Sequence, residues 1–298
     1  MRIRNISVLC VLLLSVLWVC VNSSGALADA KILPSNLLVI ETEAFFGDSS
    51  IDEIMIPEGA ENIGDKAFAY SGLKQIYIPD SITSISANAF LDCKDLIIYC
   101  SSDSFVRSFA DECKIAWTDI SAYKSVIEKY RSYYMNGAKT AGSAIGADVS
   151  EACAYSDNAG YFYKDLNNDN IPELIIADDG TGWFTSIVYD LYTLENGIPV
   201  RLLVSGPRLR YYLRTDKSIL YYGSGGASYG VWMLIKEQNG TLEPTEAIFR
   251  RSDSYYYQKD NLSCEPMDTS IQLDKATFDA MRDEYESAVY LPPLMSIA

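Results

Sequence analysis

The chain has 298 residues, of which 49% are hydrophobic and 21% charged, a balance typical of folded globular protein and long enough for about two domains. Lys and Arg number 24 against 40 Asp and Glu, which argues against nucleic acid and anionic lipid as partners. Histidine is absent, which excludes Ser-His-Asp triads, Cys-His pairs and histidine-ligated metals but leaves carboxylate-only chemistry open.

The N-terminus predicts a signal peptide over residues 1–28 and hence a secreted, extracellular protein. Two arginines precede an apolar run from Val8 to Val21, and Ala26-Leu27-Ala28 follows as a cleavage site. The run is shorter than the ~20 residues that span a membrane, and no later segment reaches that length. An uncleaved anchor and lipid attachment at Cys20 are the alternatives. Cleavage leaves 22 basic against 40 acidic residues, a net charge of −18 that favours cations or basic proteins as partners.

Five cysteines remain after the signal. They are Cys93, Cys100, Cys113, Cys153 and Cys264. Their odd number implies an unpaired thiol or an intermolecular bridge, and their spacings form no zinc motif. We expect mostly buried apolar thiols, with room for one bridge.

A repeat of 22 to 23 residues runs through the first half of the chain. Prolines at 34, 57 and 79 share this period, as do the Ala-Phe pairs at 44–45, 67–68 and 89–90. Apolar strands at 51–56, 73–78 and 96–99 close the units. One unit cannot bury its Ile, Ala and Phe alone, so the units are predicted to stack into a short solenoid with the Phe rings in its centre.

The segment Ile78–Leu96 reads I-P-x-x-I-x-x-I-x-x-x-A-F-x-x-C-x-x-L and resembles the BspA-type leucine-rich repeats of bacterial surface proteins. The resemblance covers about residues 31–117, with 101–117 as a degenerate closing unit. It implies adhesion, or binding of proteins and surfaces, in place of catalysis.

The second half predicts an antiparallel β-meander flanked by helices. Thr118 or Asp119 is predicted to cap a helix that ends at Asn136-Gly137, and residues 138–158 are predicted to form a loop. Strands are predicted at 161–163, 173–177, 184–194, 200–204, 209–214, 218–222, 231–236, 247–250 and 254–258, with hairpin turns at 195–197, 215–217 and 238–240. A last helix covers 275–289. The whole chain is therefore α+β, with a repeat module at 29–117 and an α+β domain at 118–298.

The segment D-L-N-N-D-N-I-P-E-L, residues 165–174, predicts a structural calcium site. Its ligands are the side chains of Asp165, Asn167, Asp169 and Glu173 and the backbone carbonyl of Ile171, all oxygens as calcium prefers. The segment resembles the calcium loops of integrin-type and dockerin-like repeats and the D-x-(D/N)-x-D-G-x-P-E-L segment of secreted Gram-positive proteins, with Asn170 in place of Gly. The alternative is an Asx turn without metal.

Tyrosine pairs on the predicted strands suggest a second surface. Tyr211-Tyr212, Tyr221-Tyr222 and Tyr255–Tyr257 alternate across the sheet, so outward rings would stack on sugars or bind protein, unless the last helix covers them. The glycine-rich stretch 223–230 lacks the Lys of a P-loop and predicts a hairpin loop. Ser228 and Cys153 have no histidine base and are poor nucleophiles.

These features favour a secreted bacterial surface or adhesion-type protein that binds an extracellular protein or glycan and is not an enzyme. Two alternatives stay open. One is a secreted carbohydrate-active or wall-acting enzyme with a carboxylate pair in the second domain. The other is a structural or regulatory envelope component.

Overall fold

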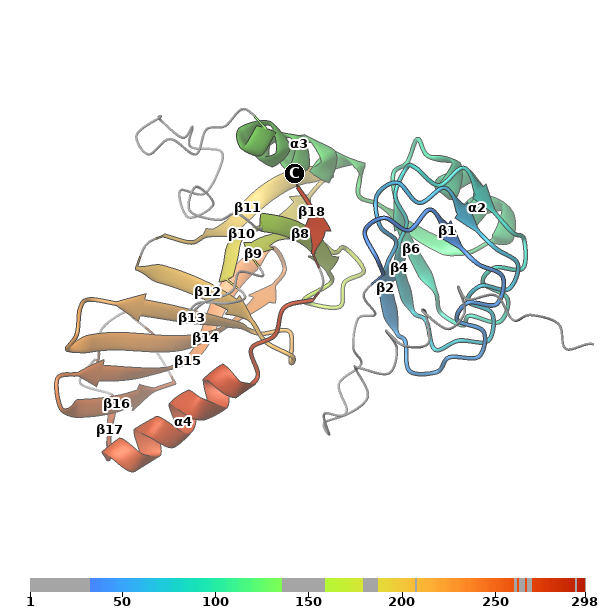
Figure 1. The fold of residues 1–298 in the computed structure, drawn as a ribbon. Coiled ribbons are helices and arrows are strands. Elements are labelled where there is room, and N and C mark those ends of the chain that lie inside the picture. The colour runs from blue at the N-terminus through green and yellow to red at the C-terminus, as the bar shows by residue number, and fades with distance from the viewer. Residues whose placement is uncertain are drawn as a thin grey trace, which may run out of the picture.

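The computed structural model describes residues 33–135, 159–178, 187–206, 208–259, 262, 266, 270–292 and 294–297. The repeat module folds into two parallel sheets, drawn in blue to green in Figure 1. The first holds β1 (Val39–Ile40), β3 (Asn62–Ile63) and β5 (Ser84–Ile85). The second holds β2 (Glu53–Met55), β4 (Gln75–Tyr77), β6 (Ile97–Cys100) and β7 (Ala116–Asp119). Strands β2, β4 and β6 are one repeat apart, as in the register of Ile54, Ile76 and Ile98.

The Ala-Phe pairs stack as the repeat spacing predicts. The Phe45 and Phe68 ring centroids lie 5.1 Å apart and those of Phe68 and Phe90 lie 5.4 Å apart, with nearly parallel planes. Main-chain bonds follow the same column, since the Phe68 N–H donates to the Ala89 carbonyl at 2.8 Å. Ala67 and Ala89 are fully buried. Their small side chains let the coils approach closely enough for the rings to touch.

Residues 101–119 close the module, as predicted for a degenerate unit. Helix α2 (Phe105–Cys113) begins after Ser104, whose hydroxyl accepts the Arg107 N–H. Val106 and Phe109 of this helix are buried against the Phe column, and β7 pairs with β6. No described helix is long and apolar enough to cross a membrane.

The second domain is built on one large antiparallel sheet. A 3-10 turn, η1 (Ser121–Tyr123), leads into helix α3 (Lys124–Met135). The strands are β8 (Ala159–Lys164), β9 (Glu173–Asp178), β10 (Ile187–Glu195), β11 (Ile198–Val204), β12 (Leu209–Leu213), β13 (Ile219–Ser224), β14 (Tyr229–Gln238), β15 (Thr241–Arg251), β16 (Ser254–Gln258), β17 (Ile271–Leu273) and β18 (Met295–Ser296). Their order is 17-16-15-14-13-12-10-9-8-18, with β11 beside β10.

The helix after the repeat module begins later than the sequence predicts. Thr118 and Asp119 are the last residues of β7, because pairing with Tyr99 and Cys100 of β6 extends the strand through them. The Asp119 carboxylate still accepts the Ser121 N–H at 2.9 Å, so its capping role is to start the 3-10 turn. The predicted cap at Asp119 therefore precedes a 3-10 turn, and the α-helix itself begins only at Lys124.

The predicted turns are confirmed. Asn196-Gly197 and Asn239-Gly240 have positive φ, as two-residue hairpins require, and Lys217 does so between β12 and β13. The glycine-rich stretch joins β13 and β14 as a hairpin. The edge strands β17 and β18 were not predicted, because three and two residues are too few for a visible alternation.

Helix α4 (Lys275–Ser287) covers one face of this sheet, shown in red in Figure 1. Its Phe278 ring lies 5.6 Å from Trp232 and 4.9 Å from Tyr255. The other partly buried rings of this cluster are Tyr212, Tyr222 and Tyr257. The helix therefore covers these tyrosines, and the idea of a free tyrosine face on this side of the sheet is wrong.

The described cysteines are free thiols. Cys100 is buried, Cys93 donates to the Phe68 carbonyl, and Cys113 is exposed. Cys153, Cys264 and the predicted signal peptide lie outside the described residues.

Removing one ring from the Phe column tests the stacked core. Phe68→Ala deletes a fully buried ring between two others, so we expect the free energy of unfolding to fall by about 3–5 kcal/mol. Chemical denaturation measures this change. Phe105→Ala, on a ring 45% exposed at the start of α2, is the matched control and should change stability by about 0.5 kcal/mol or less. Equal effects of the two substitutions would contradict the stacked core.

Candidate functional site

The two modules meet through stacked tyrosine rings. Tyr77 of β4 lies between Tyr99 of β6, at 4.7 Å, and Tyr163 of β8, at 5.3 Å, all nearly parallel. Tyr123 and Tyr161 pack against the Tyr163 ring as well. All five rings are buried in one cluster that contains side chains of both modules. The outward face of the second parallel sheet is therefore an internal contact.

Polar contacts fix this junction at its margins. The Lys164 ammonium of β8 pairs with the Glu53 carboxylate of β2, and both side chains are largely buried. Burial raises the pKa of Glu53, and the Lys164 charge opposes that rise.

Two hydroxyl groups near the junction bond to the backbone of the predicted calcium loop. The Tyr123 hydroxyl donates to the carbonyl of Pro172 at 2.8 Å, and the Thr118 hydroxyl donates to the carbonyl of Asn170 at 3.1 Å. The predicted calcium loop therefore lies at the junction.

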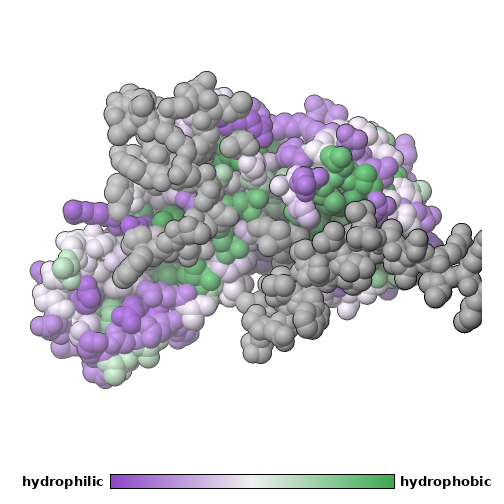
Figure 2. Space-filling view, in the orientation of Figure 1, coloured by the Kyte–Doolittle hydropathy of each residue, from purple (hydrophilic) through white to green (hydrophobic). Residues whose placement is uncertain are grey.

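A groove with a volume of about 270 Å³ opens between the modules. Its lining residues are Met55, Ile56, Glu58, Tyr77, Ile78, Pro79, Asp80, Ser101, Ile120, Lys124, Ile127, Glu128, Arg131, Tyr161, Tyr163 and Met295. They come from the second parallel sheet and the turns after it, from α3 and from β8 and β18. In Figure 2 hydrophobic surface gathers where the two modules meet. The groove thus has an aromatic and aliphatic floor and a charged rim.

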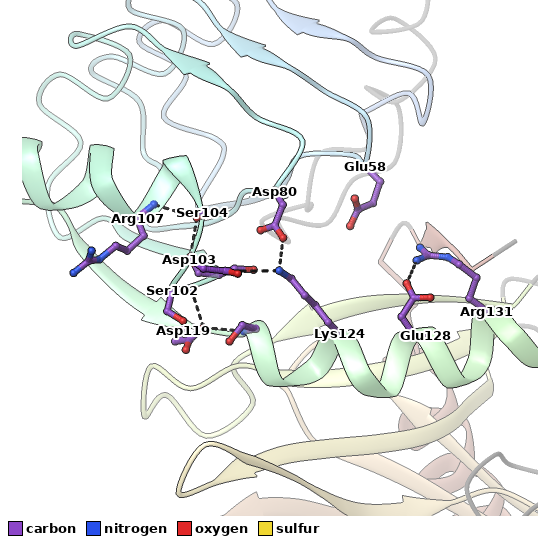
Figure 3. A network of polar contacts seen from close by, with 12 residues as sticks. Glu58, Asp80, Ser102, Asp103, Ser104, Arg107, Asp119, Lys124, Glu128 and Arg131 are labelled. Atoms are coloured by element: carbon purple, nitrogen blue, oxygen red, sulfur yellow. Dashed lines mark hydrogen bonds and ion pairs between the residues drawn. The ribbon is translucent and has the colours of Figure 1, made fainter.

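The rim holds three acidic and two basic side chains, drawn in Figure 3. Lys124 of α3 pairs with Asp80. Arg131 pairs with Glu128 on the same helix. Glu58 accepts a hydrogen bond from the hydroxyl of a floor tyrosine at 3.1 Å, and no cation among the described residues pairs with it. One rim carboxylate is therefore left for a ligand.

The predicted loop folds around its own backbone. Asp165 is buried, and its two carboxylate oxygens accept the N–H groups of Asn168 and Asn170 at 2.7 and 3.1 Å. The Asn167 side chain accepts the Asp169 N–H at 2.9 Å, and the Asp169 side chain accepts the Ile171 N–H at 2.7 Å. Asn170, at the position usually held by Gly, has the expected left-handed φ of 67°, and Asn168 is left-handed as well, with φ of 64°. These are the Asx turns that the sequence offered as an alternative to calcium.

Glu173 faces the interior at the end of the loop. Its two oxygens accept the Leu166 N–H at 2.9 Å and the Thr193 hydroxyl at 3.1 Å. Burial raises the pKa of Glu173 to about 8 despite these bonds. Lys217 approaches from the hairpin after β12 and donates to the Asp165 carbonyl at 2.7 Å, so one ammonium group already lies beside the loop.

A further carboxylate, Glu237 of β14, lies at the same loop. It is 4% exposed, and burial raises its pKa, an effect to which the nearby Asp169 and Asp165 carboxylates add. The sequence gives one indication that Glu237 is buried. Every second residue of the strand points into the core at Met233 and Ile235, and Glu237 is the next residue in that alternation. Within the described part of the chain, no three His, Cys, Asp or Glu side chains converge as a ready metal site. A cation here would need amide and carbonyl oxygens as well as carboxylates.

A double-mutant cycle on Glu53 and Lys164 tests the junction. Lys164→Met leaves a buried carboxylate unpaired, and we expect a loss of about 3–5 kcal/mol in the free energy of unfolding. The further change Glu53→Leu should recover much of that loss, because no unpaired charge remains. The exposed pair Lys275–Asp279 of α4 is the control, with an expected loss of about 0.5 kcal/mol or less. Additive losses at Glu53 and Lys164 would show that the two groups do not interact.

Comparison with known families agrees with the repeat geometry. Residues 20–131 match the family model for the BspA type leucine-rich repeat region, in six copies. No curated protein and no solved structure matches the chain. The matched residues make up less than half of the chain and leave the large antiparallel sheet outside the match. The repeat module predicted from the Pro and Ala-Phe spacing is thus confirmed as similar to the BspA-type leucine-rich repeats, a similarity that supports a bacterial surface protein involved in binding.

Proposed function

We propose that the protein is a secreted or surface-attached adhesion-type protein that recognises a protein ligand without changing it, and that the groove between the modules is its recognition site. The repeat match supports the surface-binding class. The observation that carries the proposal is the groove itself. A short repeat solenoid presents little surface of its own, and the second domain adds the walls of a concave, partly apolar site.

The rim charges favour a basic segment as the ligand. Lys124 and Arg131 already have acidic partners, whereas Glu58 holds one hydrogen bond from a neutral hydroxyl. An incoming Lys or Arg side chain would pair with Glu58 and lay its aliphatic stem on the tyrosine floor. The acidic charge of the whole chain would also speed the approach of such a partner. A glycan would use the aromatic floor but would gain less from the unpaired charge.

The same pairing favours binding over catalysis. Carboxylate-only hydrolysis needs a pair of carboxyl groups that are free to act at the reacting bond. Of the three rim carboxylates, Asp80 and Glu128 are held by cations, so Glu58 has no free carboxylate beside it on the rim. These partners support a non-catalytic role.

The 165–173 loop is proposed to bind calcium as a structural ion. The hard oxygen ligands that calcium prefers would come from Asp165, Asn167, Asp169 and the carbonyl of Ile171. Glu173 stabilises the loop by accepting a backbone N–H within it. The loop accepts hydrogen bonds from β7 and η1 of the junction. A bound ion would therefore stiffen the contact that shapes the groove.

Binding of a synthetic Lys-rich peptide tests the groove. Compared with a neutral peptide of equal length it should bind more tightly, and Glu58→Gln should weaken it by about 1–2 kcal/mol, on the order of tenfold in affinity. The reason is that this substitution removes the rim carboxylate that has no cation partner among the described residues. Isothermal titration at physiological salt measures the difference, and the peptide should be recovered intact.

Glu61→Gln is the matched control, because Glu61 is exposed on the same module and does not line the groove. It removes the same charge and should leave the affinity nearly unchanged. An equal loss of affinity in both variants would mean that the peptide is attracted by the net charge of the protein and does not bind in the groove. Cleavage of the peptide would contradict the non-catalytic role.

Thermal unfolding with and without calcium tests the loop. Calcium at about 100 times its dissociation constant should stabilise the fold by about 2.7 kcal/mol and raise Tm. Asp165→Ala should remove this shift, because it deletes a buried ligand that also orders the loop backbone. If calcium does not change the Tm of the unmutated protein, the loop is an Asx turn without a bound ion.

A further inference from the structure

The first coil of the repeat module carries apolar side chains at positions that are polar in the later coils. Leu38 and Val39 of this coil are 58% and 39% exposed. The strand register and the repeat spacing align them with polar or charged residues of the later coils, Val39 with Asn62 and Ser84, and Leu38 with Glu61 and Thr83. Exposed apolar side chains that gather at one place mark a binding surface.

This coil also lies at an open end of the solenoid. Ala44 is exposed, whereas the equivalent Ala67 and Ala89 are fully buried. Strands β1 and β2 stand first in their sheets, and each pairs with one neighbour among the described strands. A terminal coil lacks the neighbour that covers the others, and for this reason it usually has a polar outer face. Here the outer face is apolar.

The opposite end of the solenoid is closed. Strand β7 pairs with β6, and Phe109 of α2 packs on the Phe90 ring. The second domain follows directly through η1. The first coil of one copy therefore cannot stack on the last coil of another, an arrangement that would build a fibre. Stacking is left to two first coils, and such a contact is complete after two copies.

The N-terminal segment of the chain is too short to cover the first coil once the proposed signal peptide is removed. Residues 29–32 would then precede Leu33, and they reach at most ~14 Å when fully extended. One coil takes 22 or 23 residues, as the spacing of the prolines at 34, 57 and 79 shows. This segment cannot supply the coil that the open end lacks.

We propose that the end face, defined as Leu37, Leu38, Val39 and Ala44, binds the same face of a second copy of the chain in a two-fold dimer. The coils of this module already stack on one another through apolar side chains, so another first coil is the matching surface. None of the four side chains is charged. Two acidic chains can therefore meet here without burying an unpaired charge.

The dimer goes beyond the proposed recognition site, because no residue of the end face lines the groove. Its argument uses the proposed export only for the length of the N-terminal segment. Two copies would carry two grooves, and a paired molecule would be held more firmly than one copy by a surface that presents many ligands.

Sedimentation equilibrium of the full chain, purified after export, tests the dimer at concentrations up to about 100 μM. The parent should have twice the mass of one chain. The double variant Leu38→Glu with Val39→Asn places the residues of the second coil, Glu61 and Asn62, at the end face. It should weaken the dimer at least about tenfold. The circular dichroism spectrum should stay that of the parent, because the second coil holds these residues at the equivalent positions.

The salt dependence of the dimer gives a second readout. The chain has a net charge of −16, so two copies repel one another. Raising the salt from about 0.1 M to about 1 M shortens the Debye length from about 10 Å to about 3 Å and should tighten the dimer. Binding of the Lys-rich peptide in the groove should weaken over the same range, because its charges attract.

Ile271→Glu is the matched control, since Ile271 is 60% exposed on the edge strand β17 of the other domain. This variant should dimerise as the parent does. A parent that stays monomeric overturns the proposal, whether its intact mass shows residues 1–28 retained or removed. Parental dimerisation of the double variant, or an equal loss in Ile271→Glu, would place the contact elsewhere and overturn it as well. The groove is tested separately by the Lys-rich peptide.

Discussion

Tyr77 is held between a ring of its own module and a ring of the second domain, and this sandwich decides how the rest of the molecule is arranged. Tyr99 continues the repeat geometry on one side, and Tyr163 arrives from β8 on the other. Stacked rings favour a narrow range of distances and angles. Burial of apolar area contributes about 25 cal/mol per Å², so a cluster of five such rings is a large contact. The modules therefore have a defined relative position.

The groove and the acidic loop both depend on that contact. The groove exists because α3 and β8 approach the turns after β2 and β4, which leaves Glu58 facing the aromatic floor. The loop lies on the same junction, where β7 and η1 donate hydrogen bonds to its carbonyls. Recognition of a basic segment and retention of a cation are thus two proposed consequences of one interface, and both suit a chain with a large excess of acidic residues.

The sequence predicts what is encoded locally and misses what depends on distant contacts. The Phe68 column follows from a period that each unit repeats, and the turn at Asn239-Gly240 follows from its own backbone preference. The tyrosines of β4 and β6 were placed on strands, but nothing in the repeat indicates that a second domain would cover them. Likewise Glu237 is far from the loop in sequence, so only the sheet order brings it near Asp165.

Differential scanning calorimetry of the full chain tests most directly whether the tyrosine contact joins the modules into one unit. Tightly packed modules unfold together, whereas modules joined only by a linker unfold independently. The account predicts a single transition whose calorimetric and van't Hoff enthalpies agree. Two separate transitions, one for the repeat module and one for the sheet domain, would contradict it.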